Sequence, residues 1–124
     1  MFDKFFPDRY VASTYVIDFE GLYKEGVRGL IFDIDNTLVP HGAPADERAR
    51  ALFKRLKSIG FRCCLISNNQ KPRVEMFNKD IQVDYVYNAH KPSIRNYLKA
   101  MEIMGTDRDS TVFIGDQLFT DVWG

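Results

Sequence analysis

Two aspartates, Asp33 and Asp35, stand one residue apart directly after the apolar residues 30–32. In an extended strand, side chains two positions apart point to the same side, so both carboxylates lie close together at one strand end. Like charges at this distance repel each other, and burial raises the cost unless a cation compensates it. The pair therefore indicates a site that a cation completes.

Further polar side chains follow each apolar run of the chain. Besides the two aspartates they are Thr37 after the first run, Ser67, Asn68 and Asn69 after the second, Lys91 after the third, and Asp116 and Asp121 after the fourth. If the runs are parallel strands, their carboxyl ends lie along one edge of a sheet, where open α/β sheets bind ligands. Four carboxylates, two hydroxyls, an ammonium and two helix N-termini would then share one crevice.

This set of groups suits phosphoryl transfer through a covalent aspartyl phosphate. A carboxylate can act as the nucleophile, and carboxylate oxygens are ligands that Mg²⁺ prefers. The metal offsets the repulsion among the acids and lets a carboxylate approach a phosphate dianion. A hydroxyl and the amides at a helix start can bind phosphate oxygens, while a lysine neutralises the charge of the phosphoryl group.

The elements that must position these groups alternate between strand and helix. Hydrophobic periodicity, Pro and Gly predict strands at 28–35, 61–67, 83–89 and 110–115, and helices at 44–60, 72–79 and 92–104. This alternation is typical of a mostly parallel sheet with right-handed crossovers and helices on its faces. In the lead-in, residues 1–27, Asp18 is expected to cap a short helix that runs through Lys24 and stops before Gly26.

Composition limits the classes of function. The 17 basic and 17 acidic residues balance, which argues against nucleic acid as a partner. Cys63 and Cys64 are adjacent in an apolar run, so two free buried thiols are expected. No run approaches the roughly 20 apolar residues of a membrane span, and the start lacks the pattern of a signal peptide. We expect a cytoplasmic protein, and the phenylalanines at its start either pack on the domain or touch a membrane peripherally.

Four segments resemble the four motifs of the haloacid dehalogenase (HAD) superfamily of phosphatases. They are DIDNT at 33–37, LISNN at 65–69, AHKP at 89–92 and GDQLFTD at 115–121. Each follows a predicted strand and they stand in the order of the superfamily. Together with PDRYV in the lead-in, the sequences of these motifs resemble those of capless class IIIA phosphatases of the bacterial YqeG type. They are also similar to those of mitochondrial phosphatidylglycerophosphate phosphatases. The resemblance implies one Rossmann-like α/β/α domain over residues 1–124.

The resemblance also implies roles in catalysis. Asp33 would attack phosphorus and bind Mg²⁺. Asp35 would protonate the leaving group and then activate water, while its backbone carbonyl reaches the metal. Lys91 would neutralise charge between the nucleophile and the phosphate. The resemblance thereby implies a Mg²⁺-dependent phosphomonoester hydrolase.

The remaining motif residues have binding roles by the same resemblance. Thr37 would orient Asp35 or the phosphate, and Ser67 with the backbone N–H of Asn68 would hold the phosphoryl group. Asp116 would complete the metal site, with Asp121 as a second ligand or a partner through water. The sequence leaves open which of these two aspartates binds the metal directly.

Each of these residues also has a simpler structural interpretation. An aspartate after a strand can form a turn, and Thr37 or Ser67 can cap a helix. Lys91 can be an ordinary solvated lysine, and an acid such as Asp121 is favoured in the first turn of a helix. We therefore keep a non-catalytic binding or scaffold module of the same fold as an alternative. A receiver-like phosphorylation switch is a third hypothesis, against which Asp35 as a general acid argues.

The spacing between motifs excludes a cap domain. Asp33 and Ser67 are 34 positions apart, and Ser67 and Lys91 are 24 apart, which leaves room only for a helix and a strand each time. An open crevice favours a bulky substrate such as a phosphoprotein or a lipid headgroup, and phosphatidylglycerophosphate is one candidate. A partner subunit that serves as a lid, or a small substrate bound weakly, is an alternative.

The sequence stops three residues after Asp121, whereas the resemblance implies a further helix and at least one more strand. The strand at 110–115 would then be an uncovered edge, which proteins generally avoid. We therefore expect a chain shortened at its C-terminus, or an oligomer or the N-terminal segment covering this edge.

Overall fold

The structure is a computed structural model of the chain. It describes residues 14–35, 37–40, 42–67, 70–87, 94–115 and 119–121, with the backbone alone at 94 and 119–121.

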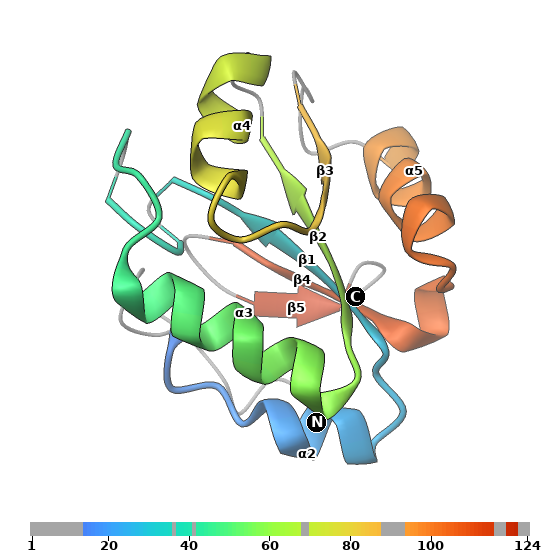
Figure 1. The fold of residues 1–124 in the computed structure, drawn as a ribbon. Helices are drawn as coiled ribbons and strands as arrows, with labels where there is room; N and C mark the ends of the chain where they lie inside the picture. The colour runs from blue at the N-terminus through green and yellow to red at the C-terminus, as the bar shows by residue number, and fades with distance from the viewer. Residues whose placement is uncertain are drawn as a thin grey trace.

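A single five-stranded sheet forms the centre of the fold, in the order β3-β2-β1-β4-β5 (Figure 1). The strands are β1 (Gly29–Asp33), β2 (Arg62–Ile66), β3 (Asp84–Val86), β4 (Thr111–Ile114) and β5 (Phe119–Asp121). The first four are mutually parallel, and β5 runs antiparallel to β4. All five residues of β1 are buried, as expected for a central strand covered on both faces.

Helices cover both faces of this sheet (Figure 1). They are α2 (Phe19–Lys24), α3 (Glu47–Ile59), α4 (Lys71–Asn78) and α5 (Ile94–Met104), with a short 3₁₀ helix, η2 (Arg108–Ser110), before β4. Apolar side chains of α2, α3 and α4 pack with Leu30 and Phe32 of β1, whereas those of α5 pack with Ile31 on the other face. The predicted α/β/α fold with a mostly parallel sheet is confirmed.

Local signals explain where the helices begin and end. The Asp18 side chain accepts a hydrogen bond from the backbone N–H of Gly21, so it caps α2 as predicted. Asp46 caps α3 in the same way through the N–H of Ala49. The chain leaves α3 at Gly60, whose φ of 122° and close approach to the Tyr23 ring favour glycine.

The connections along the carboxyl edge are short. Between β1 and β2 the described residues form a turn, a loop and α3, and between β2 and β3 they form α4 and a turn. The described part of the chain therefore contains no cap module at either place. Within the same ranges no helix has the length and apolar content to span a membrane.

The end of the sheet differs from the sequence expectation in two ways. Residues Phe119–Asp121 form a strand that the sequence pattern did not predict. This strand pairs along β4, with Asp121 opposite Val112, so β4 is not an uncovered edge. The physical reason is that the backbone N–H and C=O groups of β4 need partners, and a nearby segment supplies them.

Both cysteines are free and buried in β2, which confirms the prediction of two thiols without a disulfide. Burial away from water raises the pKa of Cys63 and of Cys64 to about 12. The thiolate is the reactive form of cysteine, so these side chains are inert at neutral pH and serve packing.

Candidate active site

The carboxyl end of β1 holds the two aspartates. Asp33 is the last residue of the strand, lies in register with Ile66 of β2, and is 8% exposed. Directly after it the chain turns tightly, because the N–H groups of Thr37, Leu38 and Val39 all donate to the carbonyl of Ile34. This turn keeps the residues after β1 at the sheet edge, so both aspartates stay there, as predicted.

Asp35 is held from two sides. Its Oδ1 accepts a hydrogen bond of 2.7 Å from the backbone N–H of Gly42 and one of 2.7 Å from Nη2 of Arg73. The side chains of Arg73 and Asp35 are only 13% and 15% exposed, so solvent screens this ion pair weakly. A cation that compensates the acids is thus present in the described chain, and it comes from α4.

Ser67 and Thr37 are buried at the same edge. Ser67 directly follows β2, and its N–H donates to the carbonyl of Val86 on β3 at 3.0 Å. The Oγ1 of Thr37 is buried and has no hydrogen-bond partner in the described ranges. An unpaired buried hydroxyl costs about 1–3 kcal/mol, so this atom is suited to a polar ligand.

The structure describes only some of the other predicted site residues. Asn68, Lys91 and Asp116 lie outside the described residues, and their roles stay predictions. The backbone of Asp121 pairs with Val112, which pairs in turn with Leu30, three positions before Asp33. The register therefore does not bring Asp121 to the carboxyl edge with the other acids.

The donor set fits a hard divalent cation. Asp33 and Asp35 offer carboxylate and carbonyl oxygens at one edge, and oxygen-only ligands suit Mg²⁺ rather than a thiolate-binding metal. Within the described ranges, no three His, Cys, Asp or Glu residues gather closely enough to hold a metal by themselves. A third acid would have to come from a residue such as Asp116.

Sequence reasoning missed Arg73. The helix 72–79 was predicted from Pro72 and from its apolar side, with Val74 and Phe77, and both of these side chains are buried as expected. The signal that could have found Arg73 is its position in the first helical turn. A cation there meets the positive end of the helix dipole, which is unfavourable without an acidic partner.

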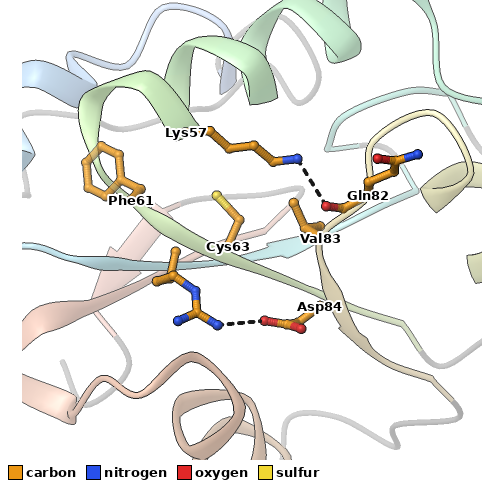
Figure 2. Close-up of a pocket in the computed structure, with 7 residues that line it drawn as sticks. Lys57, Phe61, Cys63, Gln82, Val83 and Asp84 are labelled. Atoms are coloured by element: carbon orange, nitrogen blue, oxygen red, sulfur yellow. Dashed lines mark hydrogen bonds and ion pairs between the residues drawn. The ribbon is translucent and has the colours of Figure 1, made fainter.

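A cavity of about 440 Å³ lies away from this edge (Figure 2). It is lined by Lys57, Phe61, Arg62, Cys63, Gln82, Val83 and Asp84. Arg62 and Asp84 begin β2 and β3, so the cavity opens at the amino ends of these strands. Nζ of Lys57 donates to the carbonyls of Ile81 and Gln82, and Arg62 pairs with Asp84 at 3.3 Å. The charged groups that line this cavity are thus paired with each other or with backbone carbonyls.

Comparisons with known proteins agree with this geometry. The family model of haloacid dehalogenase-like hydrolases matches residues 41–124. The chain is 37% identical over 126 residues to the probable phosphatase YqeG of Bacillus subtilis (strain 168), covering 100% of this chain and 73% of that protein.

Solved structures with low identity share the fold. A candidate 3-deoxy-D-manno-octulosonate 8-phosphate phosphatase from Vibrio cholerae superposes with a TM-score of 0.61 at 19% identity, covering 79% of this chain and 62% of the other. A hypothetical protein from Xanthomonas campestris gives 0.60 at 18% identity, with 80% and 61% covered. The chain thus spans about three fifths of each of these proteins.

Proposed function

Because the chain belongs to the haloacid dehalogenase-like hydrolases and is a phosphatase of that family, we propose that it hydrolyses phosphomonoesters through a phosphoryl group carried on Asp33. The observation that carries this proposal is the site at the end of β1. There a nearly buried Asp33 lies in register with Ile66, the residue before Ser67, while Asp35 forms an ion pair with Arg73.

The reaction has two steps. In the first, a carboxylate oxygen of Asp33 forms a bond to phosphorus as the bond to the leaving oxygen breaks, and Asp35 gives that oxygen a proton. In the second, Asp35 takes a proton from water, the water oxygen attacks phosphorus, and the bond to Asp33 breaks. Inorganic phosphate leaves, and both carboxyl groups return to their starting state.

The phosphoryl group needs donors around it during both steps. Ser67 and the N–H of Asn68 would bind its oxygens, and the unpaired hydroxyl of Thr37 is a further donor at this edge. Lys91 would neutralise charge between Asp33 and the phosphate. These roles extend the family motifs to this chain residue by residue.

Mg²⁺ is the cofactor that this donor set suits. Asp33, the carbonyl of Asp35 and Asp116 would hold it, and Asp121 is left out because its backbone lies beside Val112. When bound, the ion supplies positive charge that lets a carboxylate approach a phosphate dianion.

Removal of the metal tests this assignment. With p-nitrophenyl phosphate as substrate, treatment with EDTA is expected to lower turnover by at least ~100-fold, since the ion contributes several kcal/mol of charge stabilisation. Excess Mg²⁺ should restore the rate, while Ca²⁺ should not, because it prefers more ligands at longer distances. Circular dichroism before and after chelation controls for unfolding, and full activity in EDTA would contradict the metal site.

The substrate is proposed to be bulky, because the described residues between β1 and β2 and between β2 and β3 contain no cap module that could close over the carboxyl edge. The resemblance to class IIIA phosphatases and to mitochondrial phosphatidylglycerophosphate phosphatases makes phosphatidylglycerophosphate the first candidate. Such a substrate would bring the protein, which we propose to be cytoplasmic, to a membrane surface peripherally.

A substrate panel tests the proposal. We expect the highest kcat/KM for phosphatidylglycerophosphate in mixed micelles, above a nucleotide, a sugar phosphate and a phosphopeptide. Water-soluble glycerol phosphate is the matched control, since it has the same type of phosphoester without the lipid chains. Equal kcat/KM for the lipid and for glycerol phosphate would argue against the open crevice as a determinant of specificity.

A further inference from the structure

We propose that Arg73 is a positioning residue that holds Asp35 for protonation of the leaving group. The inference rests on the proposed function, in which Asp35 is the general acid. It concerns a residue of α4, which is joined to Asp35 across 38 positions of sequence.

The first argument is geometric. Arg73 Nη2 and the Gly42 N–H approach the same oxygen of Asp35, Oδ1, at 2.7 Å each. One donor belongs to the loop after β1 and the other to the first turn of α4, so Asp35 is fixed between two separate elements. An aspartate side chain held by two donors loses rotamer freedom before the substrate arrives, and such preorganisation favours catalysis.

The second argument is energetic. Nε and Nη1 of Arg73 are buried and have no hydrogen-bond partner in the part of the chain that is described. Buried donors without partners cost free energy, and so does a buried guanidinium that lacks full pairing. Its place near the N-terminus of α4, which begins after Gln70, adds an unfavourable interaction with the helix dipole. Stability alone therefore explains this arginine poorly, whereas a role at Asp35 explains it directly.

A positioning role predicts a selective defect. If Asp35 is misplaced, release of a leaving group that needs a proton becomes slower, because an alkoxide leaves poorly without one. A p-nitrophenolate leaves readily as the anion, so its release depends little on Asp35. Attack by Asp33 is expected to be unchanged in both cases, since the described ion pair of Arg73 is with Asp35 rather than with the reacting carboxylate.

The experiment compares an alkyl phosphate with p-nitrophenyl phosphate in Arg73→Met. We expect kcat/KM, which reports the steps up to release of the leaving group, to fall ~10- to 100-fold for the alkyl substrate, part of what a general acid contributes, and less than ~3-fold for the aryl substrate. Hydrolysis of the phosphorylated Asp33 follows that release and is the same for both substrates, so kcat/KM leaves it out of the comparison. Arg73→Lys retains a cation but lacks the planar fork, so it should recover part of the alkyl rate. An equal loss on both substrates, or no loss on either, would overturn the proposal.

Two controls test whether the effect is specific to Arg73 and depends on Asp35. Lys71→Met removes an exposed cation from the same helical turn, one that pairs with Glu75, and should leave the ratio of the two rates unchanged. In an Asp35→Asn background, Arg73→Met should cause no further loss on the alkyl substrate, because residues that act as a unit are not additive. A full additional loss there would overturn the proposal.

A readout without substrate separates this inference from the proposed function. In a double-mutant cycle on melting temperature, Arg73→Met and Asp35→Asn together should lower stability by less than the sum of the single changes. That coupling is expected even if the chain hydrolyses none of the phosphoesters tested, which would be a failure of the proposed function alone. Strict additivity would show that the two side chains do not interact, and would overturn the role of Arg73.

Discussion

Asp33→Asn is expected to abolish phosphatase activity, with a fall of at least ~10⁴-fold in kcat/KM, the scale seen when an enzyme loses its nucleophile. The amide has nearly the same shape as the carboxylate but cannot form the phosphorylated intermediate. Asp33 is 8% exposed at the end of the central strand. A water molecule therefore cannot take the place of its carboxylate and attack phosphorus from that position.

Stability should move in the opposite direction to activity. The Asp33→Asn substitution removes one of two neighbouring negative charges at a nearly buried site, so the melting temperature is expected to stay the same or rise. Loss of activity therefore cannot be attributed to unfolding. Asp80 is exposed, so Asp80→Asn is the matched control. It makes the same change from carboxylate to amide and should retain full turnover.

The measurement is p-nitrophenyl phosphate turnover with Mg²⁺, together with mass spectrometry of acid-quenched protein. Wild type should show a phosphoryl group on the peptide that contains Asp33, and the variant should show none. Equal turnover by the two proteins would exclude Asp33 as the nucleophile, whereas no turnover by either would favour the non-catalytic alternative.

The main elements could be predicted because their signals are local. The helix predicted over 44–60 is α3, observed at Glu47–Ile59, and its start is set by the Asp46 cap rather than by the nearby proline. The strand predicted over 28–35 is β1, observed at Gly29–Asp33, because a continuous apolar run is the mark of a central strand. Boundaries differ by a few residues since caps, not periodicity, decide them.

Part of the site was predictable for a different reason. Parallel strands in register bring the residues that follow them to one edge, so Asp33 and Ser67 could be placed together before any contact was known. Arg73 could not be found in this way, because its approach to Asp35 depends on how α4 is rotated on the sheet. Packing of Val74 and Phe77 decides that rotation, and it is a tertiary effect.

Asp121 shows the limit of motif resemblance. The resemblance of GDQLFTD predicted Asp121 as a second metal ligand or a partner through water, but strand pairing along β4 sets its backbone opposite Val112. Pairing between β4 and β5 depends on which segments lie near a strand edge, and short sequence patterns do not encode this. The strand itself fixes Asp33, whereas Asp35 is held by the Gly42 N–H and by Arg73.

Phe32→Ala is expected to destabilise the fold by about 3–5 kcal/mol, the usual cost of removing a buried aromatic ring. Phe32 is fully buried in β1, with its ring centroid 5.0 Å from that of Phe53 on α3 and 6.3 Å from that of Phe19 on α2. Since domains have only about 5–15 kcal/mol of stability in total, this change removes a large share. The melting temperature should fall by roughly 10 °C or more.

Denaturant unfolding of Phe32→Ala against Val16→Ala provides the measurement. Val16 is 78% exposed, so its truncation should alter the free energy of unfolding by less than about 0.5 kcal/mol. A loss below ~1 kcal/mol for Phe32→Ala would mean that the neighbouring rings collapse into the space. Phe32 directly precedes Asp33, and its ring packs on the face of the sheet opposite to the side of that carboxylate. The same packing that stabilises β1 therefore sets the direction in which Asp33, the proposed nucleophile, points.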